Sequence, residues 1–209
     1  MGRYTGAVCR RCRREGMKLY LKGQRCYMAK CPIETGRPAP GAHAQHRARK
    51  QSDYGVQLRE KQRLRRYYGM QEGQFRLFFD RALQKRGITG EQLLQMLESR
   101  LDNVVYRLGF ATSHRSARQL VLHSHVTVNG RRADRPAMLV KSGATVAVKD
   151  RPHIRECVSR SLETVETRPL APWLARDGKA LSGQFVRVPT RDEIAPFVNE
   201  QLIVELYSK

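Results

Sequence analysis

Residues 113–132 read SHRSARQLVLHSHVTVNGRR, and this stretch predicts the architecture of the middle of the chain. Ser113 is a typical N-cap residue, and the apolar residues of the next nine positions recur at helical spacing. The alternation in Val126-Thr127-Val128 predicts a short strand, and Asn129-Gly130 is a strong signal for the tight turn of a β-hairpin. We therefore expect a short helix that packs against a β-hairpin.

Cationic and polar side chains occupy the outward positions of this helix and hairpin. Such a set is often no more than an ordinary solvated surface, and that alternative stays open. The more specific interpretation is that two positive surfaces bind phosphates on either side of an RNA groove, which is recognition by shape. The candidate RNA-binding residues of this segment are Arg115, Arg118, Gln119, His123, His125, Asn129, Arg131 and Arg132.

Three helices are expected upstream of this segment. A helix over 54–68 would be capped by Ser52-Asp53 and ended by a glycine, and a second apolar helical pattern runs over 75–83. Thr89 opens a capping box, after which apolar residues continue at helical spacing through 93–108. These apolar stripes predict a protein core, and they require no cofactor.

Downstream of residue 132 the pattern mixes strands with one helix. Met138–Val140 and Thr145–Val148 predict a second strand pair, and Pro152 begins an amphipathic helix. Gln184–Val188 and Leu202–Tyr207 are apolar or alternating, which predicts strands that return to the hairpin domain. The acidic, apolar end of the chain suits contact with another protein, although a plain edge strand is equally compatible.

The charge balance predicts a polyanionic partner. The 209 residues carry 40 Lys and Arg against 19 Asp and Glu, a net charge of +21, and residues 1–68 hold two thirds of that excess. Self-repulsion of this size is normally relieved by a polyanion, although a loose basic tail is the alternative. There is no apolar run of membrane-spanning length and no secretory signal, so we expect an intracellular protein without membrane contact. The candidate RNA-binding residues of this part are Arg3, Arg10, Arg11, Arg13, Arg14, His43, Arg47, Arg49, Lys50, Arg59, Lys61, Arg63, Arg65 and Arg66.

Four cysteines near the start of the chain predict a metal site. Cys9, Cys12, Cys26 and Cys31 follow the spacing C-x₂-C-x₁₃-C-x₄-C, which allows four thiolates to converge on one ion. A closed structural zinc site is the first interpretation, and an iron–sulfur cluster is the alternative. A disulfide pairing would need an oxidising compartment, for which the sequence carries no signal. Cys157 stands alone at helical spacing with apolar neighbours and is predicted to lie in the core.

Several of these segments together resemble a known family. The runs Glu98–Gly109, Ala117–Val121 and Val126–Gly130 are similar to those of the bacterial small ribosomal subunit protein four family, also called the universal ribosomal protein four family. The resemblance extends from Met1-Gly2-Arg3-Tyr4 to Asn199–Ser208, and so covers essentially the whole chain. It implies a cytoplasmic, ribosomal protein that binds small-subunit rRNA early at a multi-helix junction and nucleates subunit assembly.

The same resemblance carries further expectations about partners and cofactor. Members of the family lie where mRNA enters the subunit, contact ribosomal protein five and affect the accuracy of translation, and some repress their own message. Members with the N-terminal cysteines bind zinc or an iron–sulfur cluster, which maps onto the four cysteines named above. The implied fold is α+β. It has a four-cysteine metal knuckle with a Pro-rich connector over 1–45, a basic helical region over 46–98, a helix-pair and hairpin RNA-binding domain over 99–165, and C-terminal strands over 166–209.

This sequence departs from the family pattern at a few positions. Pro38 stands where some members have Tyr, and the run Gly41-Ala42-His43-Ala44 alters a glycine-rich motif. His114 and Leu122 replace cations of the recognition helix, and Ser124 replaces a glycine. We therefore expect somewhat weaker RNA binding through this helix, unless His114 is protonated beside a phosphate.

Two functions other than structural RNA binding are compatible with parts of the sequence. Arg100-Leu101-Asp102 resembles a fragment of RNA pseudouridine synthases, which carry similar hairpin domains, but the chain leaves no room for a separate catalytic domain. A DNA-binding zinc protein would need a recognition helix in register with the metal, and nothing after Cys31 has that pattern. We therefore expect no enzymatic activity.

Overall fold

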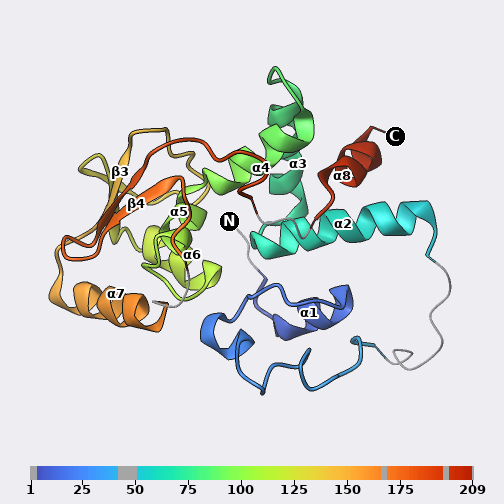
Figure 1. Cartoon of the computed structure of the whole chain (residues 1–209), viewed down its shortest axis with the longest axis horizontal. Coiled ribbons are helices and arrows are strands. Elements are labelled where there is room, and N and C mark those ends of the chain that lie inside the picture. The colour runs from blue at the N-terminus through green and yellow to red at the C-terminus, as the bar shows by residue number, and fades with distance from the viewer. Residues whose placement is uncertain (1–3, 42–50, 166–168, 195–197, 209) are drawn as a thin grey trace. The chain divides into compact units, whose positions relative to one another are not determined.

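The computed structural model describes residues 4–41, 51–165, 169–194 and 198–208 (Figure 1). The chain divides into two compact units. Unit 1 comprises residues 1–93 and 195–209, and unit 2 comprises residues 94–194. Unit 2 is therefore continuous in sequence, whereas unit 1 combines both ends of the chain. The hairpin segment 99–165 lies inside unit 2, which continues to Ile194.

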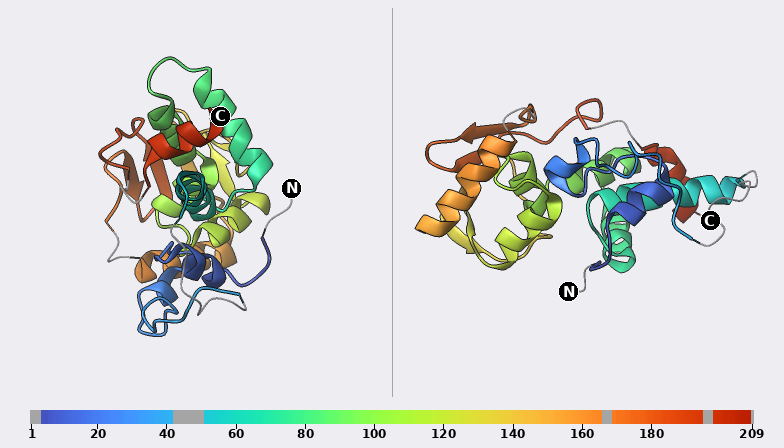
Figure 2. Two further views of the ribbon diagram at one scale, coloured as in Figure 1. Left: turned by 90° about the vertical axis from the view of Figure 1, so that its right-hand side faces the viewer. Right: turned by 90° about the horizontal axis from the view of Figure 1, so that it is seen from below.

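Unit 1 is helical in its described part. Helix α8 packs along α2 (Figures 1 and 2), where Gln57 Nε2 donates a 2.9 Å hydrogen bond to Glu205 Oε2. The Tyr207 ring lies 4.5 Å from the Phe79 ring between centroids, which ties α8 to α3 as well. The elements of this unit are α1 (Cys9–Glu15), the 3₁₀-helix η1 (Gly23–Cys26), α2 (Asp53–Tyr67), α3 (Glu72–Leu83), the start of α4 (Thr89–Glu98) and α8 (Glu200–Tyr207).

Helix α2 follows the sequence prediction closely. Ser52 caps it by accepting a hydrogen bond from Gly55 N at 3.2 Å, and Gly69 follows the helix with a left-handed φ of +64°. Helix α3 buries Phe75, Phe78, Phe79 and Ala82. Leu83 was expected on that buried side and is instead 60% exposed, because it follows Ala82 by one residue and so lies about 100° further around the helix.

The predicted strand at Leu202–Tyr207 is wrong, because these residues belong to α8. Asn199 caps this helix through its Oδ1, which accepts a 3.0 Å hydrogen bond from Gln201 N, and Glu200 lies in the first turn. Ile203 is fully buried. The apolar run therefore covers α2 as one face of a helix and adds no strand to a sheet.

Unit 2 is α+β, which confirms the predicted fold class. Its strands form one antiparallel sheet in the order β2-β1-β3-β5-β4, with α5, α6 and α7 beside it (Figures 1 and 2). A single core includes Leu101, Phe110, Val126, Trp173 and Phe185. The elements are α5 (Leu101–Arg107), α6 (His114–Leu122), β1 (Val126–Val128), β2 (Arg131–Ala133), β3 (Thr145–Val148), α7 (Pro152–Thr164), β4 (Leu174–Asp177) and β5 (Ser182–Phe185).

The continuous helix expected through residue 108 is broken into α4 and α5. Arg100 is extended, with ψ of 137°, because its neighbours bond to a distant loop. Leu101 N donates to Met138 O at 2.8 Å, and Val140 N donates to Ser99 O at 2.8 Å. Met138–Val140 therefore does not pair with Thr145–Val148 as predicted. Leu139 forms an isolated antiparallel bridge with Arg100, and β3 pairs with β1 instead.

The C-terminal strands of unit 2 partly match the prediction. β5 begins at Ser182 and ends at Phe185, whereas the sequence predicted a strand over 184–188. β5 pairs with β3, so this strand returns to the hairpin as expected. β4 was not predicted, since Leu174–Asp177 buries only its first residue and lacks alternating apolar positions.

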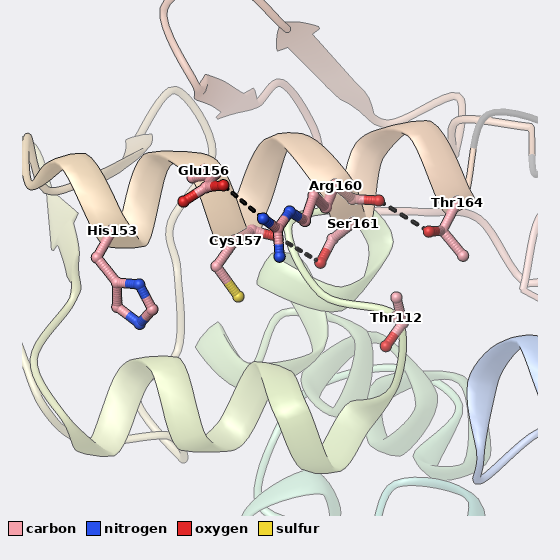
Figure 3. A pocket seen from close by; sticks show the side chains of 7 residues that line it. All are labelled: Thr112, His153, Glu156, Cys157, Arg160, Ser161 and Thr164. Carbon is pink, nitrogen blue, oxygen red and sulfur yellow. Dashed lines mark hydrogen bonds and ion pairs between the residues drawn. The ribbon is translucent and has the colours of Figure 1, made fainter.

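Cys157 lies on the exposed side of α7, so the prediction of a core cysteine is wrong. The next residue, Val158, is the fully buried one. Cys157 lines a pocket of about 270 Å³. Figure 3 shows its side chain extending from α7, with His153 on the same helix and Thr112 across from it. Within the described residues, every helix falls short of the length and apolar content that crossing a bilayer requires.

Candidate nucleic-acid interface

The hairpin of unit 2 presents its cations on a rigid turn. Asn129 and Gly130 both have positive φ, +49° and +75°, as a two-residue turn between right-twisted strands requires. Asn129 Oδ1 accepts a 2.8 Å hydrogen bond from Thr145 N, so its side chain fastens the turn to β3. Arg131 and Arg132 follow on β2, and both are exposed. Asn129 thus orients the arginines, which face solvent and can contact phosphates.

Helix α6 supplies the second set of predicted RNA-binding residues. Ser113 caps it by accepting from Ser116 N at 3.3 Å, as predicted. Its buried residues are Ala117 and Val121, so the opposite side faces solvent. Arg115, Gln119 and His123 are exposed there.

Ser124 ends α6 in a conformation that suits glycine. Its φ is +59°, in the left-handed region, and its N–H donates to Val121 O at 2.8 Å. A residue without Cβ would adopt this conformation at no steric cost, which gives a physical reason for the glycine that the resemblance implies here.

Arg118 behaves differently from its neighbours on α6. Its Nη1 donates to Asp102 Oδ2 at 3.3 Å, and its side chain is 14% exposed. Asp102 also accepts from Arg100 Nε at 3.0 Å and from Nη2 at 2.7 Å. The guanidinium of Arg118 therefore belongs to a buried charge network and reaches solvent only at its edge.

His114 is part of a second buried network. Asn103 Nδ2 donates to Glu98 Oε2, so its Oδ1 is the acceptor, and His114 Nε2 donates to it at 3.0 Å. The His114 ring also stacks on Tyr106, with ring centroids 3.8 Å apart. Arg107 binds the same Glu98 carboxylate, with Nη2 2.6 Å from Oε1. His114 therefore helps to fix α6 on α5.

Two further histidines lie in a strongly positive environment. The rings of His123 and His125 stack with centroids 5.9 Å apart. Burial lowers the pKa of His125, and the charges of Arg151, His123 and Lys149 lower it further. The lowered pKa favours the neutral form of His125, and the cations around it make this surface attractive to anions.

In unit 1 the predicted cations of α1 are only partly exposed. Arg10 and Arg14 are exposed, whereas Arg11 and Arg13 are half-buried. The Arg11 guanidinium lies 3.8 Å above the Tyr4 ring, and Arg13 Nη1 donates to Pro38 O at 2.8 Å. Five further predicted RNA contacts lie outside the described residues: Arg3, His43, Arg47, Arg49 and Lys50.

The five cations of α2 pair with three carboxylates, those of Glu72, Glu15 and Glu60. Lys61 and Arg65 pair with Glu72, whose carboxylate also accepts a 2.9 Å hydrogen bond from Tyr207 Oη. Burial alone would raise the pKa of Glu72, but the bonds from Lys61 and Tyr207 outweigh it and lower that pKa. Burial and the bond to Glu72 raise the pKa of Tyr207.

The other three cations of α2 surround a single buried carboxylate. Arg59 and Arg66 donate hydrogen bonds to Glu15, whose side chain is fully buried. Arg63 Nε lies 3.9 Å from the same carboxylate, while Arg63 Nη1 donates to Glu60. We call Glu15 and these three arginines the Glu15 cluster. The sequence prediction missed the carboxylate, although a signal was present: Glu15 is the only acidic residue among the first 33.

The four N-terminal cysteines gather in one small region. Cys12, Cys26 and Cys31 are buried, Cys9 is half-buried, and all four are free thiols. Burial raises the pKa of Cys12 and of Cys26, and the neighbouring thiols raise both further. Lys22 N points at Cys26 Sγ from 3.4 Å, as a backbone amide does beside a metal-bound sulfur. The donor chemistry thus fits a thiophilic ion, although no group of three or more potential ligands in the described part of the chain is arranged to hold one.

Two family descriptions match consecutive parts of the chain. Residues 3–98 match the Ribosomal protein S4/S9 N-terminal domain, and residues 99–146 match the S4 domain. Small ribosomal subunit protein uS4 of Thermus thermophilus is 55% identical over 209 residues, and the protein of that name from Acetivibrio thermocellus is 56% identical over 209. Each alignment covers 100% of both chains. The chain belongs to the uS4 family.

The uS4 family match places the candidate interface within recognised domains. The S4-domain match covers α5, α6 and the β1–β2 hairpin and ends inside β3. All eight candidate residues of unit 2 lie within it. The cysteines, α2 and the Glu15 cluster lie within the N-terminal domain match.

Proposed function

We propose that the chain is a structural constituent of the small ribosomal subunit in the cytoplasm, and that it binds rRNA directly. The supporting observation is that Arg115, Arg131 and Arg132 are exposed within the S4-domain segment. The chain also shares its full length with small ribosomal subunit proteins. Lys and Arg displace condensed counterions from folded RNA, so the affinity should fall steeply as salt rises. Because this protein surface is preformed, it lowers the cost of assembling an RNA junction, which suits early binding and nucleation of subunit assembly.

The test measures binding of the full-length protein to an rRNA fragment that contains the multi-helix junction, with an unrelated stem-loop as competitor. The variant Arg131→Glu/Arg132→Glu should weaken junction binding and flatten the plot of log affinity against log salt by about 0.7–0.9 for each phosphate that is no longer bound. Arg155→Glu/Arg160→Glu is the matched control, because both arginines already pair with carboxylates on the exposed side of α7. Equal losses for the two variants, or none for the first, would contradict the proposal.

We propose that the protein is a binding protein and not an enzyme. Asp102 is the residue that a pseudouridine synthase-like mechanism would use as nucleophile. Its carboxylate is 7% exposed and engaged by Arg100 and Arg118, so it is unsuited to attack a ribose or base. Incubation with uridine-containing RNA should produce no isomerisation; isomerisation that Asp102→Ala abolishes would establish the enzyme instead. Competition between rRNA and duplex DNA at fixed salt distinguishes the DNA-binding alternative.

We propose that Cys9, Cys12, Cys26 and Cys31 bind a structural zinc ion. The support is the four free thiols, three of them buried, in a part of the chain with little other apolar core. Such an ion would contribute folding free energy to residues 4–41, since structural zinc sites fold with their metal. Elemental analysis of protein purified without oxygen should give one zinc per chain, whereas iron and inorganic sulfide would identify the iron–sulfur alternative.

We propose that unit 1 also contacts other ribosomal proteins, with ribosomal protein five as the first candidate. We further propose that the chain lies near the path of mRNA in the subunit and affects the accuracy of translation. A groove of about 640 Å³ between α2 and α8 supports the protein contact, because it combines Val56 and Leu202 with the acidic Asp53 and Glu205. Crosslinking from Ser208→Cys in assembled subunits should identify the neighbour. Crosslinks to rRNA alone would contradict this contact.

A further inference from the structure

A buried carboxylate lies inside the most basic part of unit 1. Glu15 Oε1 accepts from Arg59 Nη1 at 3.4 Å and from Arg66 Nη1, and Glu15 Oε2 lies 3.9 Å from Arg63 Nε. The Glu15 side chain has no exposed surface. A buried charge is costly unless it is paired. Here two guanidinium groups donate to the Glu15 carboxylate, and a third, bonded to Glu60, lies 3.9 Å away.

The geometry of the two helices explains how one carboxylate reaches three cations. Glu15 is the last residue of α1, and the three arginines are spaced four and three residues apart on α2. That spacing places them on one side of the helix. Glu15 therefore contacts a single stripe of α2. It orients Arg59 and Arg66 by hydrogen bonds, and it acts on Arg63 by charge alone, together with the bond from Arg63 to Glu60.

The arginines keep much of their binding capacity. Their side chains are 21%, 29% and 18% exposed for Arg59, Arg63 and Arg66. A guanidinium has five N–H donors in a fixed fork, and the pair with Glu15 uses one nitrogen of each. Arg63 Nη1 also donates to Glu60 Oε1, and each guanidinium still keeps further N–H donors beyond these bonds.

The cluster also carries a large excess of positive charge. Burial lowers the pKa of Arg66, and although Glu15 raises it, the charges of Arg59, Arg65 and Arg14 lower it again. Burial and the charges of Arg66 and Arg65 likewise lower the pKa of Arg11. Without a negative centre, these cations would repel one another and turn toward solvent.

We propose that Glu15 is a positioning residue for RNA binding, which holds Arg59, Arg63 and Arg66 as a preformed set of phosphate ligands. This inference rests on the proposed rRNA binding. It predicts that removal of this negative charge weakens RNA binding. If only net charge mattered, removal of a carboxylate from a basic surface would strengthen binding to a polyanion. If Glu15 positions the arginines, its removal weakens binding, because the ordering of three flexible side chains must then occur on association.

The test compares two substitutions that each add one positive charge to the full-length protein. Glu15→Gln should bind the rRNA junction fragment about tenfold more weakly, with a salt dependence shallower by about 0.7–0.9 for each phosphate that the arginines no longer bind. Glu34→Gln is the matched control, since Glu34 is 51% exposed and pairs only with Lys18 in the described structure. It should bind as tightly as wild type or slightly more tightly. Glu15→Asp keeps the charge and should restore most of the affinity.

A second set of variants distinguishes this positioning role from a general structural role of Glu15. In the variant Arg59→Gln/Arg63→Gln/Arg66→Gln, Glu15→Gln should cause no further loss of affinity, because its effect acts through these arginines. The same tenfold loss in that background would overturn the proposal, as would a Glu15→Gln protein that binds as tightly as wild type. If the wild-type protein itself showed no preference for the junction over the stem-loop, the proposed function would fail first.

Discussion

The substitution Asp102→Asn removes one negative charge from the interior of unit 2 and leaves the shape of the side chain nearly unchanged. The carboxylate accepts two hydrogen bonds from Arg100 and a third from Arg118. The Arg100 side chain is 1% exposed and the Asp102 side chain 7% exposed. Water therefore cannot solvate the arginine charge that the substitution leaves without its carboxylate.

The expected cost follows from this burial. Removal of one partner from a buried ion pair costs about 3–5 kcal/mol, because the other charge stays in a medium of low polarity. Asp102 also lies in the first turn of α5, where a negative charge contributes about 0.3–1 kcal/mol. The Asn amide oxygen can still accept from the donors on its own side, so we expect a loss of about 3–4 kcal/mol in the free energy of unfolding of unit 2.

Urea denaturation followed by tryptophan fluorescence measures this loss directly. Trp173 is the only tryptophan of the chain and is 2% exposed in the core of unit 2, so its emission reports unfolding of that unit. Asp150→Asn is the control, because Asp150 pairs with Arg155 where the side chains are 84% and 50% exposed. It should change stability by less than about 0.5 kcal/mol. A loss below about 1 kcal/mol for Asp102→Asn, or equal losses for both variants, would refute the reasoning.

Three further predictions follow from single residues. Gly183→Ala should destabilise unit 2 by about 1–3 kcal/mol in urea denaturation, since an added Cβ would lie 2.9 Å from Ala175 O and also meet Leu108. An unchanged free energy of unfolding would show that β4 and β5 move apart at little cost. The bond from Arg187 and that from Thr190 N lower the pKa of Glu193 to about 2, so its contribution to stability is present above the unfolded value near pH 4.5 and is lost as the pH falls toward 2. Carboxyl-carbon NMR measures that titration directly, and a midpoint near pH 4 would contradict the ion pair. Cys9→Ser should remove hydrogen-exchange protection from residues 4–41 and spare unit 2, whereas unchanged protection in that segment would contradict the proposed metal site.

The elements that the sequence predicted well are those with local signals. Ser52 and Ser113 are N-caps whose side chains bond to the backbone three residues later, and Asn129-Gly130 forces one kind of turn. Such signals lie within a few residues of the structure they determine.

The misplaced elements depend on contacts that are distant in sequence. The break at Arg100 is made by backbone bonds to a loop almost 40 residues later, and no local pattern marks it. The run Leu202–Tyr207 is short and apolar, so its periodicity suits a strand or a helix, and packing on α2 with the Asn199 cap decides for the helix. The same limit applies to the candidate interface: the sequence located the cations, but not the carboxylates that bind Arg118 or the three arginines of the Glu15 cluster.

The insertion of unit 2 between the two segments of unit 1 has a consequence for biosynthesis. About 100 residues separate unit 1's first segment from its second, and at roughly 5–20 residues per second their translation takes about 5–20 s. During that interval α2 exists without α8, so Gln57 and Glu60 lack Glu205 and the backbone of Asn199 as partners. Unit 2 can thus be complete on the nascent chain while unit 1 still lacks α8, and unit 1 closes only after that helix has been synthesised.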